Sequence, residues 1–532
     1  MEIENKLAAP KDNSRVLIFV ATLVAVSIKV ILLLTKSVPF NSDEAIVSLM
    51  ARHILHGERP VFFYGQAYMG SLDAWLTAGV MGVVNDPVLS IRLVQIFLYA
   101  GFLISLGWLT RKWLQEPAYS WILVSLAAVP PVVVTLYTSA SLGGYGEVLL
   151  LGNLILGWGY DVTLGGKERS LWRGAALGLA GGVSYWTLVM TGVYLLAVGI
   201  WGILRFSWKR LPAYGLALFM FLLGSLPWWL NLLQTHGAPL GMLFSGAYSD
   251  TGTIADHVLG ILLFGIPTML GLRHPWSAGW LNPALAFWGL VLSLAAAVYF
   301  LRKQPVKTEI IRPGGRFILW TMVGVLLVLL ILSAYGRDPT GRYFLPLLVP
   351  LVFLWGAFII GLWKQKRIWG MVGLALFLAF NGTATIQAAL SPDRITTQFD
   401  PITRFDNSHD AELMSFLREH NAQLGYSNYW VSFRIAALSD EQIIYSPRLP
   451  DKVDMRYTPM YNRYPVYDQQ VNHAPDAAYI TTLHPALDVL LRENFQRLGV
   501  SWQEATIGPY QVFYAFSRKV MPEEIIYPEV ES

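Results

Sequence analysis

The sequence predicts an α-helical polytopic membrane protein that ends in a small soluble domain. Of its 532 residues, 54% are hydrophobic and only 14% are charged, a balance too apolar for a single soluble globule. Eleven apolar runs have roughly the length that crosses a bilayer, whereas residues 391–532 contain no such run. The sequence has no cysteine, which excludes disulfides, thiol nucleophiles and thiolate metal sites.

The apolar runs follow one another along the first 390 residues. They lie near residues 16–35, 88–110, 118–137, 143–163, 171–187, 189–205, 211–234, 283–301, 317–335, 343–363 and 368–389. Two shorter segments, 71–85 and 257–272, are interrupted by Gly, Asp or Pro, which favours interfacial or re-entrant helices. We therefore predict a transmembrane domain of residues 1–390, with a first outer loop at about residues 36–88 that is too long for a simple connector.

Basic residues indicate how the spans are oriented. With eleven spans and a cytoplasmic N-terminus, the basic clusters between spans fall on the cytoplasmic side, as the positive-inside rule requires. Examples are Arg111/Lys112, Lys209/Arg210 and Lys364/Lys366/Arg367. Counting 71–85 as a span breaks this agreement, and the C-terminal domain is therefore predicted to be extracytoplasmic. Because the net charge is only +4 and its basic residues follow the spans, no nucleic-acid partner is expected.

The N-terminal segment is predicted to be a retained anchor. Lys6, Lys11 and Arg15 precede the first apolar run, and no small-residue cleavage site follows it.

Residues 391–532 predict a small α/β domain. Helix-like patterns at 409–420, 428–438 and 485–497 alternate with strand-like patterns at 442–446, 477–481 and 509–516. Aromatic residues are frequent, as in YSNYW at 426–430 and YTPMYNRYPVY at 457–467. Such stretches suit a carbohydrate or membrane surface, and they suit an ordinary core equally well.

Two adjacent acids, Asp43 and Glu44, follow the first span directly. Asn41 or Ser42 can cap the helix after them, and acids in a first turn complement the helix dipole, which explains at least one acid. That helix is amphipathic, with Ile46, Met50 and Ile54 spaced by four, so it is predicted to lie along the membrane interface. Partial desolvation there would suit Asp43 to accept a proton from a hydroxyl, while Glu44 caps the helix.

Other charged residues fall on the same predicted outer face. Glu147 lies at the outer end of the fourth span, beside Gly143, Gly144 and Gly146, where a backbone can approach a ligand closely. An acid so near a span end can also simply snorkel to the interface.

Arginines on the outer face indicate a bound anion. Arg337 and Arg342 flank a Pro-Thr-Gly turn between the ninth and tenth spans, and Arg92 lies near the outer end of the second span. Outer arginines run against the topology bias, which favours contact with a lipid phosphate. Ordinary headgroup contact explains each of them equally well.

The sequence contains no complete transition-metal site. His53 and His56 are three residues apart and lack an evident third ligand. A divalent cation held by Asp43, Glu147 and a phosphate is the more plausible arrangement. No other cofactor is expected, since no phosphate-cradling Walker sequence and no G-x-S-x-G elbow occurs.

Together these residues resemble the bacterial members of glycosyltransferase family 39, GT-C membrane transferases related to protein O-mannosyltransferases and aminoarabinose transferase. The shared features are an acidic pair after the first span, an amphipathic helix ending in His-Gly, the segment VFFYGQAYMGSL, a juxtamembrane helix, an arginine in the second span and a late R-Y-x-x-P. The resemblance covers residues 15–150 well, 335–363 moderately and the C-terminal domain hardly at all.

The resemblance implies a GT-C-like fold in a bacterial plasma membrane and an inverting transfer from a polyprenyl-phosphate sugar to an acceptor hydroxyl on the outer face. The acceptor would be a glycan, a lipid or a protein. Asp43 would be the base, Glu147 a second acid, and Arg342 with Tyr343 would neutralise the leaving phosphate. Such a donor already carries its leaving group, so a base and positive charge on opposite sides of the anomeric carbon suffice.

The aromatic segment supplies the expected substrate loop. Tyr64, Gln66 and Tyr68, with Glu44, are its candidate substrate residues. Many relatives have Lys-Pro-Pro where this chain has Gly65-Gln66-Ala67. A lysine that might contact the donor phosphate is therefore absent, which indicates a branch with its own acceptor.

Two other classes of function fit parts of the pattern. A transporter or flippase of lipid-linked sugars would use buried acids as gates and should show paired, interrupted spans in corresponding halves. A non-catalytic membrane protein that binds glycan would use the aromatic C-terminal domain and would not need Asp43. Because the irregular elements crowd one face, the sequence favours the interfacial enzyme.

Overall fold

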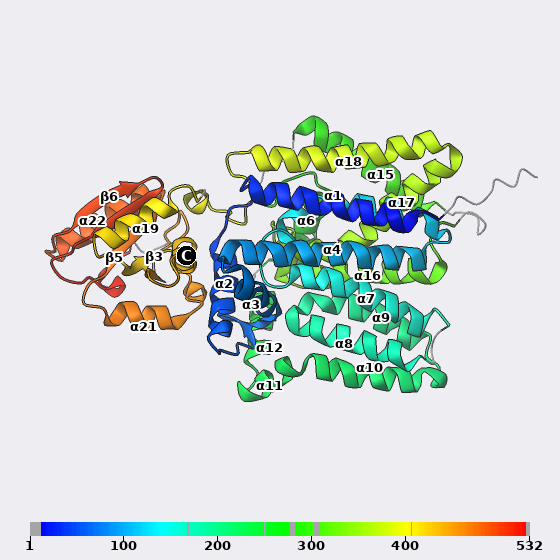
Figure 1. Ribbon diagram of the computed structural model, residues 1–532, viewed down its shortest axis with the longest axis horizontal. Helices are drawn as coiled ribbons and strands as arrows, with labels where there is room; N and C mark the ends of the chain where they lie inside the picture. The colour runs from blue at the N-terminus through cyan, green and yellow to red at the C-terminus, as the bar shows by residue number, and fades with distance from the viewer. Residues whose placement is uncertain are drawn as a thin grey trace, which may run out of the picture.

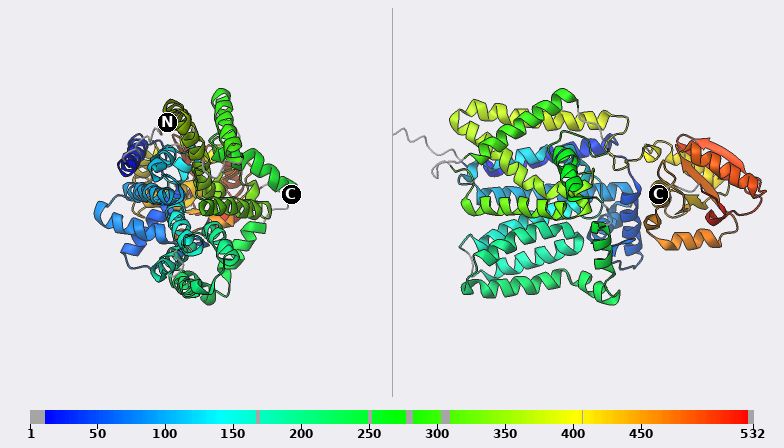
Figure 2. Two further views of the ribbon diagram at one scale, coloured as in Figure 1. Left: turned by 90° about the vertical axis from the view of Figure 1, so that its right-hand side faces the viewer. Right: turned by 180° about the vertical axis from the view of Figure 1, so that it is seen from behind.

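The computed structural model of the protein describes residues 12–166, 170–248, 252–276, 282–302, 309–405 and 407–527. Long helices lie side by side in a bundle, and a smaller part with a β-sheet is attached at one end of it (Figure 1). We call residues 391–527 the C-terminal α/β region. The end of the bundle that faces this region is the domain end, and the other is the opposite end; the view from behind in Figure 2 (right) shows the same arrangement.

The bundle is built from the predicted apolar runs, every one of which is helical. Its helices are α1 (Ser14–Leu34), α4 (Pro87–Trp113), α5 (Ser120–Ala128), α6 (Val132–Tyr137), α7 (Tyr145–Thr163), α8 (Leu171–Thr187), α9 (Gly192–Leu204), α10 (Leu211–Gly224), α11 (Leu226–Gln234), α15 (Pro283–Leu301), α16 (Pro313–Ile331), α17 (Leu348–Gln365) and α18 (Arg367–Leu390).

Six helices in the described residues are long and apolar enough to cross a membrane, and the bent pair α10–α11 makes a seventh span. The predicted eleven are reached only by adding α7, α8, α9 and the broken pair α5–α6, which fall short in length or hydropathy. The breaks have local causes: Pro130 and Pro131 separate α5 from α6, and Pro227 begins α11 after a bend of 59°. The chain is an integral membrane protein.

Shorter elements gather near the domain end. They are α2 (Ser42–Leu55), β1 (Phe62–Phe63), β2 (Gln66–Gly70), α3 (Leu72–Val84), α12 (Ala238–Tyr248), α13 (Ile254–Gly260) and α14 (Ile266–Met269), with the tight helical turns η6 (Ala334–Arg337) and η7 (Arg342–Leu347). Strands β1 and β2 pair as an antiparallel hairpin. The irregular backbone of the protein is therefore concentrated beside the C-terminal α/β region.

Helix α2 is buried on more sides than its amphipathic pattern shows. Its apolar spacing predicted a helix lying along the membrane interface, and in the structure Ala45, Ile46, Met50 and Ala51 are fully buried and so is Glu44. The helix runs across the end of the bundle, between it and the C-terminal α/β region (Figure 1). That region packs on the second face of the helix, which the apolar spacing alone does not show; that α2 lies along the membrane interface stays a prediction.

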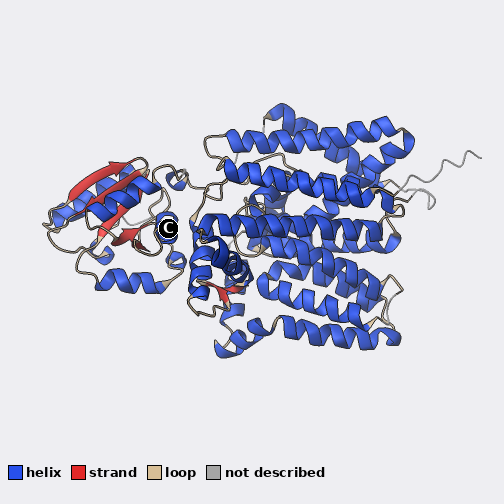
Figure 3. Ribbon diagram, in the orientation of Figure 1, coloured by secondary structure: helices blue, strands red, loops and turns tan. Residues whose placement is uncertain are grey.

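The C-terminal α/β region has the predicted mixture of helices and strands (Figure 3). It contains α19 (Asp410–Glu419), α20 (Tyr429–Leu438), α21 (Pro465–His473), α22 (Pro485–Arg497), β3 (Leu424–Ser427), β4 (Ile444–Pro447), β5 (Ala478–Thr482), β6 (Gln503–Ile507) and β7 (Tyr510–Tyr514). The sheet order is β4-β3-β5-β7-β6; β3 is parallel to β4 and β5, and the remaining pairs are antiparallel. Its boundary at residue 391 directly follows α18, and its standing as a separate domain stays a prediction.

Basic residues collect at the opposite end of the bundle. Lys112 and Arg173 both pair with Asp161, at 2.8 Å and 3.0 Å, and Lys364 pairs with Glu116 at 2.5 Å. Lys6 and Lys11 lie outside the described residues. The basic clusters that served to orient the spans are thus far from the C-terminal α/β region, as the predicted orientation requires.

Candidate active site at the domain end

Asp43 stands in the first turn of α2, facing the C-terminal α/β region. Asn41 caps the helix by accepting a hydrogen bond from the Glu44 amide at 3.1 Å, as the sequence predicts. The Asp43 side chain is only partly buried. Its Oδ1 accepts a hydrogen bond from the Tyr429 hydroxyl of α20. Its Oδ2 accepts none from the described residues, so one carboxylate oxygen is left for a ligand.

Glu44, the other acid of the pair, is fully buried and has a different environment. Its Oε2 accepts from Arg92 Nη2 at 2.9 Å, and its Oε1 accepts from the Ser141 amide at 3.3 Å. Burial raises the pKa of Glu44, and the charge of Arg92 opposes this shift. Glu44 therefore fixes the chain around it and does more than cap a helix.

Arg92 was predicted to contact a donor phosphate, but its guanidinium is engaged by the protein. Besides Glu44, it donates to the carbonyls of Val38 at 3.0 Å and Ser139 at 2.5 Å, and only 5% of the residue is exposed. We therefore do not count Arg92 and Glu44 among the substrate contacts. Their ion pair links α2 to α4 and to the neighbouring backbone, and so helps to hold Asp43 in place.

Arg342 reaches the same end of the bundle from the start of η7. A turn precedes η7, in which the Thr340 amide donates to Asp338 Oδ1 at 2.8 Å. Gly341 in this turn has a left-handed backbone conformation, with φ of 75°. The guanidinium pairs with Asp338, Nη2 to Oδ2 at 3.1 Å, and lies 4.8 Å from the Tyr343 ring centroid. Its side chain is still 40% exposed, so the charge of Arg342 is accessible to a ligand.

Tyrosines connect Asp43 to Arg342, which is distant in the sequence. Tyr137 of α6 lies within electrostatic reach of Asp43, Arg342 and Asp338. Tyr461 of the C-terminal α/β region lies within reach of both Asp43 and Arg342. We call these five residues the Asp43–Arg342 site. A carboxylate and a guanidinium thus both act electrostatically on the same two tyrosines, as a base and a phosphate-binding cation at one site would.

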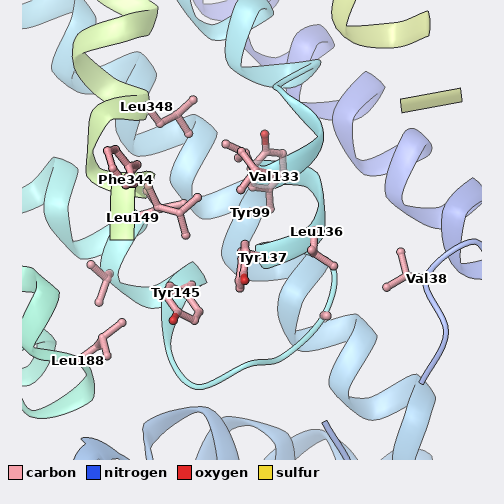
Figure 4. Packing of buried hydrophobic residues seen from close by; sticks show 14 of the residues in the cluster. Val38, Tyr99, Val133, Leu136, Tyr137, Tyr145, Leu149, Leu188, Phe344 and Leu348 are labelled. Atoms are coloured by element: carbon pink, nitrogen blue, oxygen red, sulfur yellow. The ribbon is translucent and has the colours of Figure 1, made fainter. Parts of the chain in front are cut away.

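More tyrosines extend the site toward the first loop. The rings of Tyr137 and Tyr145 are 5.0 Å apart at their centroids, and Figure 4 shows the two side by side. The Tyr335 and Tyr343 rings are 4.3 Å apart. Tyr68, predicted from the aromatic segment, lies within electrostatic reach of Tyr145, Tyr335 and Tyr343. The predicted Tyr68 and Tyr343 thus belong to one aromatic surface around Arg342.

Glu147 lies near Asp73 and not, as expected, near Asp43. It is 2% exposed, and neither carboxylate oxygen has a hydrogen-bond partner in another described residue. The nearby charge that acts on it is that of Asp73 in α3. Asp73 itself accepts hydrogen bonds from Ser141 Oγ and, at 3.2 Å, from Gln95 Nε2, and burial raises its pKa to about 6.

The remaining predicted residues lie at the edges of the site. The Tyr64 hydroxyl donates to Glu58 at 2.7 Å and is 2.8 Å from His53 Nδ1. The Gln66 amide oxygen, in the orientation that satisfies both groups, accepts from Arg463 at 2.8 and 2.9 Å. Arg337 is exposed on η6, where its charge acts on Asp256 of α13. Gln66 thus contacts the C-terminal α/β region through Arg463, and Tyr64 does so by stacking on Tyr464, with ring centroids 4.8 Å apart.

The described residues contain no group of three His, Asp or Glu side chains that could hold a metal ion. His53 is occupied by Tyr64 and by Glu441, whose carboxylate oxygens are 3.1 Å from Nε2. Glu147, the expected second ligand of a divalent cation beside Asp43, lies instead within the electrostatic influence of Asp73. The divalent cation stays a prediction, and no step below depends on one.

Comparison with known proteins identifies the fold. No family model and no curated protein matches the sequence. The structure is similar to that of ArnT from Cupriavidus metallidurans bound to undecaprenyl phosphate, with a TM-score of 0.61, 11% sequence identity, and coverage of 94% of this chain and 97% of ArnT. The apo structure of the same protein gives a TM-score of 0.58 at 12% identity, covering 88% of this chain and 92% of ArnT.

These likenesses define a class: an integral membrane protein with the GT-C-like fold that the sequence predicts. One particular protein with a similar structure is ArnT, and the likeness covers nearly the whole length of both chains. Membership of glycosyltransferase family 39 stays a prediction.

Several residues of the site were not singled out in the sequence. Tyr429 and Tyr461 lie in the two aromatic stretches noted above, where nothing separates a site residue from a core residue. Tyr137 is the last residue of an apolar run, and Asp338 directly precedes the Pro-Thr-Gly turn. A weak signal was available for Asp338, because an acid four residues before Arg342 forms a short ion pair with it.

Proposed function

We propose that the protein is a membrane glycosyltransferase that moves a sugar from a polyprenyl-phosphate donor to an acceptor hydroxyl. The observation that carries this proposal is the convergence of Asp43 and Arg342 on the same two tyrosines, with one oxygen of Asp43 and much of the Arg342 side chain left open. The similarity to ArnT, whose structure is bound to undecaprenyl phosphate, supports a lipid-phosphate donor.

In the proposed reaction Asp43 Oδ2 takes the proton of the acceptor hydroxyl as its oxygen attacks the anomeric carbon. The bond between that carbon and the phosphate oxygen breaks, and its electron pair leaves with the polyprenyl phosphate. Arg342 stabilises the negative charge that develops on the phosphate, at a position held by Asp338. A single displacement of this kind inverts the anomeric configuration.

The tyrosines around Arg342 have a supporting part in this proposal. Tyr68, Tyr137 and Tyr343 offer hydroxyl groups and ring faces on which a sugar can stack and hydrogen-bond. Because the donor already contains its leaving group, the chemistry requires only positioning, a base and positive charge. The sugar itself and the nature of the acceptor are set by contacts of this aromatic surface.

The proposal is tested with purified protein and a panel of polyprenyl-phosphate sugars. We expect release of polyprenyl phosphate that depends on an acceptor, and a product of inverted anomeric configuration by NMR. Nucleotide sugars serve as the control donors and should not be consumed. If the protein moves lipid-linked sugars across a vesicle membrane without breaking the sugar–phosphate bond, it is a transporter and the proposal is wrong.

We also propose that the domain end faces away from the cytoplasm, in a bacterial plasma membrane, because the basic residues lie at the opposite end. Since the chain has no native cysteine, single cysteines can report this orientation. In intact cells a membrane-impermeant maleimide should label Asp476→Cys in the exposed part of the C-terminal α/β region. Arg367→Cys at the opposite end should be labelled only after permeabilisation, and the reverse result would contradict the orientation.

A further inference from the structure

Tyr429 joins the C-terminal α/β region to Asp43. Only 2% of Tyr429 is exposed, and its hydroxyl donates to Asp43 Oδ1. A buried tyrosine hydroxyl requires a hydrogen-bond partner, and here the partner is the proposed base. Burial and the negative charge of Asp43 raise the pKa of Tyr429, so the hydroxyl keeps its proton and acts as the donor.

The backbone that carries Tyr429 is firmly held. It follows β3 directly, and Asn428 caps α20 by accepting from the amides of Trp430 at 3.0 Å and Val431 at 3.2 Å. The Asn428 amide also donates to Thr482 Oγ1 at the end of β5, at 2.8 Å. Tyr429 therefore extends from the rigid carboxyl edge of the parallel strands, and its position follows that of the whole region.

A second set of contacts fixes the other ends of the same two helices. Arg52 pairs with Asp440, and His53 pairs with Glu441 at 3.1 Å. Asp440 and Glu441 both adopt left-handed backbone conformations, with φ of 52° and 59°, which non-glycine residues rarely do. Helices α2 and α20 thus lie parallel, joined at their starts by Asp43 and Tyr429 and at their ends by this pair of acids, which we call the acid clamp.

The first loop adds a third point of attachment. Arg463 donates to the Gln66 amide oxygen and lies with its guanidinium carbon 5.8 Å from the Tyr429 ring centroid. Tyr461 stacks on the same ring, with centroids 4.7 Å apart. The C-terminal α/β region therefore encloses Tyr429 with groups that also contact the transmembrane part.

We propose that Tyr429 is a positioning residue for the base: it holds Asp43 Oδ1 so that Oδ2 points to the acceptor hydroxyl, and the docked C-terminal α/β region is the active state of the protein. This inference rests on the proposed function. It gives the C-terminal α/β region a direct part in the reaction, because without it neither the Tyr429 bond nor the Tyr461 hydroxyl is present at the site.

The first test is Tyr429→Phe, which removes the hydroxyl and keeps the ring. We expect kcat to fall by roughly tenfold to a hundredfold, with the donor KM unchanged. Without the hydrogen bond from Tyr429, the Asp43 carboxylate is no longer held in line with the acceptor hydroxyl, and a small displacement of a base slows the reaction. The matched control is Tyr445→Phe, which removes a buried hydroxyl of the same region that donates to the Ala422 carbonyl at 2.6 Å. The control should keep the wild-type kcat.

A cross-linked background separates positioning from docking. The double variant Arg52→Cys, Asp440→Cys replaces one contact of the acid clamp and introduces the only thiols of the chain. Linking them with a short bifunctional maleimide should preserve at least about half of the turnover of the unlinked variant, since the docked state is active. Loss of all turnover on linking would overturn the proposal that the docked state is active.

When Tyr429→Phe is added to the cross-linked Arg52→Cys, Asp440→Cys variant, kcat should fall by the same factor as it does without the cross-link. If linking restores its kcat, Tyr429 only helps the region to dock and the positioning role is wrong. Failure of the proposed function gives a different result: the wild-type protein then turns over no polyprenyl-phosphate sugar. Wild-type turnover together with an unimpaired Tyr429→Phe would refute this inference alone.

Discussion

An ion pair at each end of the bundle shows how differently the two ends use charge. At the opposite end, the side chains of Lys364 and Glu116 are 34% and 50% exposed. At the domain end, those of Arg92 and Glu44 are 6% and 0% exposed. An exposed pair contributes little to stability, whereas a buried pair must keep both partners, because either alone is an unpaired charge out of water. Charge at the opposite end is mostly exposed and carries the proposed orientation, whereas charge at the domain end is buried and holds the chain next to Asp43.

The largest effect is expected from breaking the buried pair. Glu44→Gln leaves the Arg92 charge buried without its partner and should lower the free energy of unfolding by about 3–5 kcal/mol. Denaturant unfolding in detergent micelles, followed by tryptophan fluorescence, measures this change. A loss below about 1 kcal/mol would show that the pair is as dispensable as an exposed one.

The next effect tests the accessible arginine of the domain end. Arg342→Gln removes the positive charge opposite Asp43 and should lower kcat/KM for the lipid-linked donor by roughly tenfold to a hundredfold, the scale of one charge-assisted hydrogen bond. The matched control, Arg367→Gln at the opposite end, should leave kcat/KM within about twofold. Equal losses in the two variants would contradict a special role for Arg342.

A pH-dependent effect is expected next to the site. Burial raises the pKa of Asp451, whose Oδ2 accepts from Trp430 Nε1, to about 6 from an ordinary 3.8. Between about pH 4 and pH 6 the folded protein keeps this proton, whereas the unfolded chain has lost it. The free energy of unfolding therefore falls as the pH rises through this range and is constant above it.

Asp451→Asn should remove this slope and stabilise the protein at pH 7 by roughly 1–2 kcal/mol, since the amide oxygen can still accept from Trp430. Thermal unfolding between pH 4 and 8 checks the prediction. An unchanged slope, or a variant that is less stable at pH 7, would show that Asp451 is not the titrating group.

The smallest effect is expected at the opposite end. Glu116→Gln breaks the exposed pair with Lys364 and should change the free energy of unfolding by less than about 1 kcal/mol. This variant carries the same chemical change as Glu44→Gln, so the difference between the two measurements isolates the contribution of burial. Similar values would mean that the two ends do not differ as described.

The sequence was sufficient where the signal is local. Apolar length marked every helical run of the bundle, alternating patterns marked most of the C-terminal α/β region, and Asn41 was recognised as a cap. Strands β3 and β6 and helix α21 were missed, because short segments in a region rich in Tyr and Pro carry little periodicity. Asp43 and Arg342 were both selected because polar residues at the end of a span are conspicuous.

Partners could not be predicted where packing decides them. Arg92 and Glu44 were assigned to a phosphate and a helix cap, since nothing in the sequence shows that two residues 48 positions apart have side chains 2.9 Å from each other. Glu147 was assigned to Asp43, but the fold brings it to Asp73. The contact from Tyr429 depends on how the C-terminal α/β region docks on α2, which is a property of two folded surfaces.

The most direct test of the account is donor turnover and donor binding in Asp43→Asn, compared with Asp86→Asn. Asp86 is an exposed cap of α4 that accepts from the Leu89 amide, and asparagine caps a helix equally well. We expect Asp43→Asn to bind the polyprenyl-phosphate sugar normally and to turn it over at least about a hundredfold more slowly, while Asp86→Asn keeps the wild-type rate. Turnover near the wild-type rate in Asp43→Asn would contradict this expectation.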